Sequence, residues 1–244
     1  MTQHEQDPGG SGGPGGGPGG PQAPEEFGAA YWEDRYGSGQ GVSKHDPSPS
    51  LVAEAAGLTP GRALDAGCGV GGDALWLAAR GWDVTAVDIA PAALEQGRRA
   101  AETAGPTSAG RIDWLHGDLT AWDPGGRRFD LVSSHYVHAP GPPELLLRRL
   151  ASWVAPGGAL LVVGHDGGHG HDGGHGHGAQ RGHGHAHPPG AQLRAEQVVA
   201  VLPEDEWEVL VAESRTHTVR RPGGGSTTLD DVVVHARRRP GSGA

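Results

Sequence analysis

The sequence predicts an α/β fold in which a mostly parallel, seven-stranded sheet is covered by helices on both faces. First, apolar runs of strand length alternate with segments of helical periodicity from residue 62 to residue 202. Strands that alternate with helices are joined by right-handed crossovers and therefore run parallel. Second, the last two strand-like segments have no helix between them. We expect these two to form an antiparallel pair at one edge of the sheet.

The elements follow one another with the punctuation expected of this fold. Seven strands are predicted at residues 63–66, 83–88, 111–116, 129–134, 159–163, 207–214 and 229–235. Helices are predicted from Gly72 to Gly81, from Pro91 to Ala101, from Pro142 to Val154 and from Gln192 to Leu202. Proline at the start and glycine at the end of such segments favour helix boundaries. Residues 155–158 are predicted to form a turn before the fifth strand.

Two low-complexity segments flank or interrupt this domain. Residues 1–24 are rich in Gly and Pro and are expected to form a disordered arm, and residues 239–244 a short tail. The domain itself is expected to span residues 25–238, interrupted by a His/Gly-rich loop at 164–190. Eight of the 15 histidines lie in that loop, between His165 and His187. Glycine spacers leave these imidazoles without fixed geometry, so we expect adventitious divalent-metal binding and no dedicated metal site.

Charge and composition narrow the possible partners. The net charge is −10, from 29 acidic against 19 basic residues, which disfavours binding to nucleic acid or to an anionic membrane. One cysteine, Cys68, excludes an intramolecular disulfide and a cysteine-built zinc site. No signal-peptide pattern or apolar run of membrane-spanning length is present, so a cytoplasmic location is expected.

A glycine-rich turn follows the first predicted strand. Gly67, Gly69 and Gly72 satisfy the pattern G-x-G-x-x-G, and Asp88 ends the next strand, 21 residues after Gly67. Glycines allow a tight turn and a close approach of the backbone to a ligand. A carboxylate at the second strand end can accept both hydroxyls of a ribose. Strand, turn, helix, strand and acid in this order indicate a nucleoside-binding site on a Rossmann-like sheet.

At a finer level the sequence resembles the class I S-adenosylmethionine-dependent methyltransferases. Five motifs in the family's order carry this resemblance: Leu64-Asp65-Ala66-Gly67-Cys68-Gly69-Val70-Gly71, Val87-Asp88-Ile89, Gly117-Asp118-Leu119, Phe129-Asp130-Leu131-Val132-Ser133 and Val154-Ala155-Pro156-Gly157-Gly158. The antiparallel final pair is also that family's ending. The run from Tyr31 to Tyr36 is similar to small-molecule methyltransferases of the tellurite-resistance and thiopurine type. The resemblance implies S-adenosylmethionine as the cofactor and a small-molecule methyl acceptor.

The resemblance also assigns roles to individual residues. It implies that the cofactor's methionine moiety lies against the glycines and that Asp65 helps to hold its amino group. It implies that Asp88 binds the ribose hydroxyls and that Ile89, Asp118 and Leu119 contact the adenine. The glycines that the resemblance places against the methionine moiety are Gly67, Gly69 and Gly71. Ala90, before Pro91, departs from the hydroxyl cap frequent in the family and weakens only a helix cap.

The acceptor side is less determined by the sequence. Methyl transfer from a sulfonium needs orientation and a dry site more than it needs an acid or a metal. His135 and Tyr136, which follow the fourth strand, and Tyr31 are candidates for positioning the acceptor. Ser134 and His138 lie in the same segment. We expect residues 27–50 either to close as a lid over the methyl group or simply to pack a helix onto the sheet.

Two other functions remain open at this point. A nicotinamide-dependent oxidoreductase could use the same glycine loop, although Asp118, the turn at 155–158 and the antiparallel ending count against it. A metal-binding protein could use the His-rich loop, although the retained Asp65, Asp88 and Asp118 count against a vestigial domain. Cys68 lies in a crowded turn with no adjacent histidine, and we expect it to have a packing role.

Overall fold

The structure is a computed structural model of the chain and describes residues 27–38, 45–166, 192–220 and 226–241. The predicted Gly/Pro arm, nearly all of the His/Gly-rich loop and the final residues of the tail lie outside these ranges. The predicted helices and strands lie within them.

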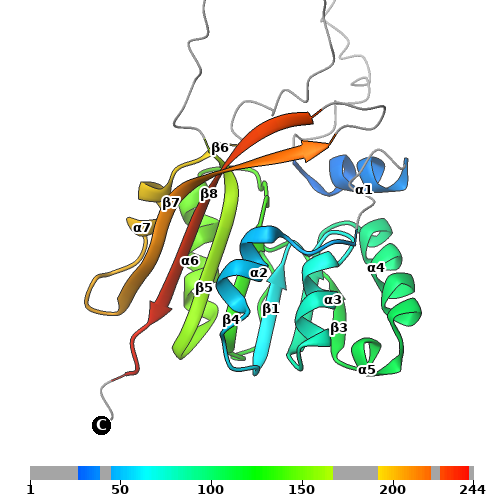
Figure 1. The fold of residues 1–244 in the computed structure, drawn as a ribbon, viewed down its shortest axis with the longest axis horizontal. Coiled ribbons are helices and arrows are strands. Elements are labelled where there is room, and N and C mark those ends of the chain that lie inside the picture. The colour runs from blue at the N-terminus through cyan, green and yellow to red at the C-terminus, as the bar shows by residue number, and fades with distance from the viewer. Residues whose placement is uncertain (1–26, 39–44, 167–191, 221–225, 242–244) are drawn as a thin grey trace, which may run out of the picture.

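One sheet forms the centre of the molecule (Figure 1), and its main path has the strand order β3-β2-β1-β4-β5-β8-β7. The strands on this path are β1 (Arg62–Ala66), β2 (Asp83–Asp88), β3 (Ile112–His116), β4 (Phe129–His135), β5 (Val154–Asp166), β7 (Trp207–Arg220) and β8 (Ser226–Arg238). Neighbouring strands from β3 to β5 pair in parallel. β8 pairs antiparallel with both β5 and β7. The predicted fold, a Rossmann-like parallel sheet with an antiparallel final pair, is confirmed.

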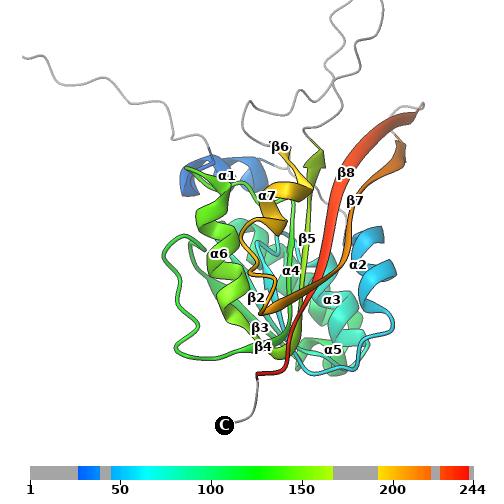
Figure 2. The ribbon, with the colours of Figure 1, turned by 90° about the vertical axis from the view of Figure 1, so that its left-hand side faces the viewer.

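Helices cover both faces of the sheet (Figure 2). One apolar core lies under α6 (Pro143–Trp153) and α7 (Ala195–Val199). The other lies under α2 (Pro49–Ala55), α3 (Gly72–Ala79) and α4 (Pro91–Ala104), with the short α5 (Pro106–Ala109) below α4. The helix α1 (Ala29–Gly37) lies apart from both layers, above α4 at the carboxyl ends of the parallel strands (Figure 1).

The structure corrects several predicted boundaries. The predicted helix from Gln192 to Leu202 begins instead with an eighth strand, β6 (Gln192–Leu193), which pairs with β5. The predicted turn at 155–158 lies within β5, where the pairing with β4 jumps from Val154 to Ala159. The antiparallel pair is longer than predicted, because β7 and β8 continue to pair through polar segments as far as Arg220 and Ser226.

Candidate cofactor and acceptor site

The glycine turn after β1 is built from left-handed residues. Gly67, Gly69 and Gly71 have φ angles of 76°, 51° and 82°, a region that a side chain makes costly. The N–H groups of Gly67 and Cys68 both donate to the carbonyl of Val87 on β2, at 2.8 and 3.0 Å. The turn is therefore held against the end of β2, and α3 begins directly after it.

Each of these glycines also has a neighbour that leaves no room for a Cβ atom. A Cβ on Gly67 would collide with the Val137 side chain, and one on Gly71 with the indole of Trp114. A Cβ on Gly69 would lie 2.9 Å from the Tyr36 hydroxyl of α1. The turn is thus enclosed by side chains from three other parts of the chain, and Gly71 has a packing role independent of any ligand.

Asp88 ends β2 beside this turn and is buried. Its Oδ2 accepts a hydrogen bond from the N–H of Gly69 at 2.8 Å, and its Oδ1 accepts one from the N–H of Ala90 at 2.9 Å. Burial raises the pKa of Asp88, while these backbone donors act in the opposite direction. Each carboxylate oxygen can accept more than one hydrogen bond, so both retain capacity for ligand hydroxyls.

The segment after β3 lies next to Asp88. The N–H of Gly117 donates to the Asp88 carbonyl at 3.0 Å, and His116 Nε2 lies 3.1 Å from the Ile89 carbonyl oxygen. Asp118 is exposed, and its Oδ1 accepts hydrogen bonds from both the N–H and the hydroxyl of Thr120. The Leu119 side chain is buried in the core. The structure therefore brings the four residues predicted for the nucleoside, at positions 88, 89, 118 and 119, to two adjacent strand ends.

Asp65, at the end of β1, is only 3% exposed. Its Oδ2 is buried without a hydrogen-bond partner among the described residues. Burial, and after it the nearby carboxylates of Asp73 and Asp88, raise the pKa of Asp65 well above its usual range. A buried carboxylate oxygen without a donor, with two other carboxylates close by, favours a cationic ligand group at this place.

Asp73, in the first turn of α3, contacts His135 at the end of β4. This contact was not predicted from the sequence. Asp73 Oδ2 lies 2.8 Å from His135 Nδ1, and Asp73 Oδ1 accepts the N–H of Ser48 at 2.6 Å. Burial alone would raise the pKa of Asp73, but His135 and the Ser48 N–H lower it. An acid in the first turn of a helix also interacts favourably with the helix dipole. That position, directly after the glycine turn, was the available signal in the sequence.

His135 completes a chain of contacts from Ser133 to Asp73. Its Nε2 lies 3.1 Å from the Ser133 hydroxyl, so both ring nitrogens have partners. The order Ser, His, Asp is that of a hydrolase triad, but Ser133 is completely buried within β4 and cannot reach a substrate. The geometry therefore supports a role for the His135 ring in holding Asp73 and the end of β4 in place.

Tyr136 adopts an unusual conformation directly after His135. It has a φ of 53°, which is strained for a residue with a bulky side chain. Its N–H donates to Val163 at 2.8 Å, and its hydroxyl donates to Asp231 Oδ2 at 2.5 Å. Burial and the Asp231 carboxylate raise the pKa of Tyr136, so its hydroxyl stays protonated at neutral pH. The Tyr136 ring also lies 4.8 Å from the ring of His165, at the end of β5.

The helix α1 places an aromatic cluster at the same end of the sheet. Phe27 packs against Tyr31 and His138, with ring centroids 5.7 and 5.3 Å apart. Trp32 packs against the Tyr31 ring at 5.1 Å and stacks on His138 at 6.2 Å. His138 in turn stacks on His165 at 5.8 Å. A continuous set of rings therefore joins Tyr31 to Tyr136, two of the predicted acceptor residues.

Polar contacts attach α1 to α4. Glu33 Oε2 accepts the N–H of Ala92 at 3.0 Å in the first turn of α4, and Gln96 donates to the Tyr36 carbonyl at 3.3 Å. Ala90, at the N-cap of α4, has no side-chain oxygen that could accept a hydrogen bond from the start of the helix. Glu33 of α1 supplies this acceptor instead. Because the cap comes from α1, the start of α4 and the position of α1 are coupled.

Cys68 has the packing role predicted for it. It is buried in the core under α3, where its thiol faces the Gly69 carbonyl at 3.7 Å. Burial, followed by the charges of Asp65 and Asp88, raises the pKa of Cys68 well above its usual value. A thiol that stays protonated is a poor nucleophile.

Two kinds of feature are absent from the described ranges. No helix there is both long and apolar enough to cross a membrane. The same residues contain no cluster of three or more His, Cys, Asp or Glu side chains arranged to hold a metal ion.

The sheet order, the glycine turn and the acids at two strand ends define a nucleoside-binding α/β domain. Residues 63–158 match the family described as methyltransferase domain. A probable thiol methyltransferase 2 from Arabidopsis thaliana is 28% identical over 141 residues, covering 57% of this chain and 58% of the relative. Ribosomal RNA small subunit methyltransferase C from Chromohalobacter salexigens is 32% identical over 120 residues, covering 47% of this chain and 34% of the relative. The matches thus span only part of both relatives.

Solved structures share the fold at lower identity. One, from work on the conversion of a disulfide bond into a thioacetal group in echinomycin biosynthesis, has a TM-score of 0.64 at 20% identity, covering 88% of this chain and 93% of that one. TehB from Haemophilus influenzae has a TM-score of 0.61 at 16% identity, covering 85% and 67%. Magnesium protoporphyrin IX methyltransferase from Synechocystis PCC 6803, with bound S-adenosylmethionine, has a TM-score of 0.52 at 20% identity, covering 90% and 86%. The chain therefore contains a segment, residues 63–158, that matches a methyltransferase domain, and it shares its fold with a methyltransferase solved with bound S-adenosylmethionine.

The site residues fit this cofactor. S-adenosylmethionine carries an ammonium and a sulfonium, and a cationic ligand beside the neighbouring carboxyl groups of Asp65, Asp73 and Asp88 would favour their charged forms. The Oδ2 of Asp65 has no hydrogen-bond donor among the described residues and suits the ammonium. The glycine turn and the carboxylate of Asp88 suit the methionine chain and the ribose.

Proposed function

We propose that the protein transfers the methyl group of S-adenosylmethionine to a small-molecule acceptor. The observation that carries this proposal is the convergence of the glycine turn, Asp65 and Asp88 at the carboxyl ends of β1 and β2. In the proposed arrangement, Asp65 binds the cofactor's ammonium, Asp88 binds the ribose hydroxyls, and the 117–119 segment and Ile89 flank the adenine. The bound cofactor supplies an electrophilic methyl group on sulfur.

The protein's own residues would orient the acceptor and exclude water. His135, fixed by Asp73 and Ser133, holds the end of β4 in place. Tyr136 and Tyr31 lie at the two ends of the aromatic cluster and would flank the acceptor. The faces of these rings favour a positive charge, such as the sulfonium. Because the Tyr136 hydroxyl donates its hydrogen bond to Asp231, its oxygen can still accept a hydrogen bond from the methyl acceptor.

A thiol is the first acceptor class to test, because a thiol methyltransferase is among the similar proteins. The net charge of −10 disfavours nucleic acid, although one relative is a ribosomal RNA methyltransferase. We also propose that the protein acts in the cytoplasm, with no membrane partner. Any binding of divalent metal to the His-rich loop is proposed to be adventitious.

The direct test is methyl transfer from S-adenosylmethionine labelled in its methyl group. We expect label to be transferred to at least one neutral small thiol, such as benzyl mercaptan. The Asp88→Ala variant should lose this activity, whereas Asp113→Asn, at an exposed position on β3, should retain it. Label that appears only in ribosomal RNA would contradict a small-molecule acceptor.

A further inference from the structure

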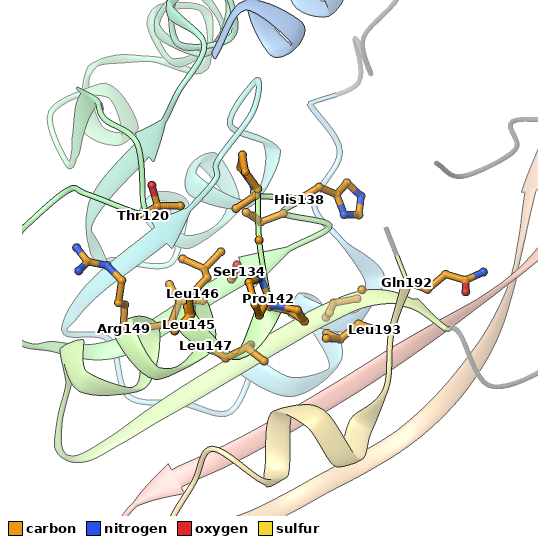
Figure 3. Close-up of a pocket in the computed structure, with 18 residues that line it drawn as sticks. Thr120, Ser134, His138, Pro142, Leu145, Leu146, Leu147, Arg149, Gln192 and Leu193 are labelled. Atoms are coloured by element: carbon orange, nitrogen blue, oxygen red, sulfur yellow. The ribbon is translucent and has the colours of Figure 1, made fainter. Parts of the chain in front are cut away.

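A mostly apolar pocket lies beside the proposed cofactor site and has a volume of about 180 Å³. Its lining extends from α6 and the end of β5 to β6 (Figure 3). Leu146, Leu147 and Leu150 of α6 and Val163 of β5 contribute buried apolar side chains to it. A cavity of about 150 Å³ with an apolar lining is large enough to hold benzene. The pocket can therefore hold one small ring or a short aliphatic chain.

The lining of the pocket carries a single permanently charged side chain, and that side chain already has partners. Among its lining residues, Arg149 is the only one with a permanently charged side chain. Its guanidinium already donates to the carbonyl oxygens of Leu119 at 3.0 Å and Trp122 at 2.6 Å. His138, also in the lining, stacks on Trp32 and His165. A cationic ligand would lose its hydration here without an anionic partner, and an anionic ligand would have to compete with these carbonyl oxygens for Arg149.

Two contacts join this pocket to the cofactor site. Val137 lines the pocket and at the same time packs directly on Gly67. Thr120 also lines the pocket and donates two hydrogen bonds to Asp118, which is proposed to contact the adenine. The pocket therefore borders the proposed cofactor site at two places, beside the glycine turn and beside the proposed adenine end.

The rim of the pocket is rigid and partly exposed. It consists of Pro140-Gly141-Pro142-Pro143, in which the prolines restrict the backbone. Leu145 follows in α6 and leaves 64% of its surface exposed, the largest fraction among the exposed large hydrophobic residues described. A rigid rim reduces the ordering cost of binding. An exposed leucine beside an apolar pocket gives an incoming apolar group further contact area.

We propose that this pocket binds the uncharged, apolar part of the methyl acceptor, so that the acceptor is a small neutral molecule with an aromatic or short aliphatic group. This proposal rests on the proposed function and names the acceptor's chemical class. A carboxylate or an ammonium on the part of the acceptor that enters the pocket is disfavoured.

The test uses fluorine NMR to measure binding of three probes to the full chain saturated with S-adenosylhomocysteine. The probes are fluorobenzene, 4-fluorobenzoate and 4-fluorobenzylamine, which are neutral, anionic and cationic at neutral pH. We expect fluorobenzene to bind at least about tenfold more tightly than either charged probe, a difference of about 1.4 kcal/mol. Equal affinities, or preference for a charged probe, would overturn the proposal.

A matched pair of variants locates the binding. Leu145→Lys puts a charge on the pocket's rim. Leu210→Lys changes the same type of residue on β7, where the leucine is 45% exposed and does not line the pocket. Fluorobenzene affinity should fall by about tenfold in the first variant and stay unchanged in the second. Loss in both or in neither would contradict the pocket. Binding of S-adenosylhomocysteine to each variant is measured first by calorimetry. A failure to bind the cofactor is thereby distinguished from a failure of the pocket to bind the probe.

Discussion

At the scale of single residues, the site depends on buried carboxylates whose partners differ. Asp73 has His135 and Ser48, and Asp88 has two backbone N–H groups, whereas Asp65 has an oxygen with no donor among the described residues. The order of the motifs in the sequence was enough to select Asp65 and Asp88. The partner of each carboxylate depends on side-chain packing, so these differences appear only in the structure.

The raised pKa of Asp65 predicts a pH-dependent effect of cofactor binding. In the free protein the native state retains a proton that the unfolded state has already released, so stability falls as pH rises from the usual carboxyl range. A cationic group beside Asp65 removes this penalty. S-adenosylhomocysteine, which carries the same ammonium, should therefore raise the melting temperature more at about pH 8 than at about pH 5, close to the usual carboxyl range.

The control for this prediction is Asp65→Asn, which removes the titrating group with little change in shape. Its melting temperature should respond less to the ligand and equally at both pH values. Asp113→Asn, at an exposed position on β3, should behave like the unmodified chain. If Asp65→Asn retained the full pH dependence, another group would have to be responsible.

The hydrogen bond of the Tyr136 hydroxyl leads to a prediction about the free energy of unfolding. This hydroxyl donates to the buried carboxylate of Asp231, 95 residues further along the chain. A hydrogen bond to a charged group is worth about 1.5–3 kcal/mol. Tyr136→Phe should lower the free energy of unfolding in urea by about that amount, while Tyr31→Phe should change it by less than about 0.5 kcal/mol. A loss under about 0.5 kcal/mol for Tyr136→Phe would contradict a stabilising Tyr136–Asp231 bond.

No local pattern in the sequence could have indicated this pair. Tyr136 was selected because it follows the fourth strand, but Asp231 lies on the antiparallel strand β8. The register of β8 against β5 places Asp231 opposite His165, and that pairing is set by the whole sheet. Contacts of this range depend on topology and register together.

At the scale of elements, the apolar pattern of the sequence predicted the extents of the parallel strands better than those of the antiparallel strands β7 and β8. Buried strands are nearly continuous apolar runs and are recognisable on that ground. The upper parts of β7 and β8 are polar, with residues such as Thr216 and Asp230 joined by a hydrogen bond of 2.7 Å. A polar ladder gives no alternating apolar signal, so both strands extend further than predicted.

The position of α1 leads us to predict that cofactor binding reduces the mobility of this helix. Its contacts with the rest of the molecule include the Glu33 cap on α4 and the position of the Tyr36 hydroxyl above Gly69. We propose that residues 27–50 act as a lid, of which residues 39–44 lie outside the described ranges. Hydrogen exchange over residues 29–38 should slow when S-adenosylhomocysteine binds.

The variant Glu33→Gln should speed exchange in both α1 and the first turn of α4, because the charged cap is weakened. Asp34→Asn, one residue away on the exposed side of α1, serves as the control. Equal protection of α1 with and without ligand would make it an ordinary packed helix.

At the scale of the whole molecule, the two strands that flank the His/Gly-rich loop, β5 and β6, pair with each other. His165 is opposite Gln192 and Asp166 opposite Leu193, so β5 and β6 are adjacent where the loop leaves and returns. A shorter connection can therefore join the same ends, and loop closure depends only weakly on length. Because β5 and β6 pair in parallel, a linker must be long enough to cross back to the start of β6. Replacement of residues 167–191 by a Gly/Ser linker of about twelve residues should leave the affinity for S-adenosylhomocysteine unchanged.

Two outcomes of this replacement are informative. Retained affinity, together with loss of Ni²⁺ or Zn²⁺ binding, would separate the metal-binding segment from the methyltransferase site. A shortened chain that folds, as judged by circular dichroism, but no longer binds the nucleoside would show that the loop belongs to the site.

The central claim is that Asp88 and the glycine turn bind S-adenosylmethionine, and calorimetry of S-adenosylhomocysteine tests it most directly. The unmodified chain should bind with a dissociation constant in the micromolar range, a binding free energy of about −8 kcal/mol. Asp88→Ala should cost about 2–3 kcal/mol through two lost ribose hydrogen bonds, and the exposed control Asp113→Asn should cost nothing measurable. Absence of binding by the unmodified chain, or equal affinity in Asp88→Ala, would contradict the assignment.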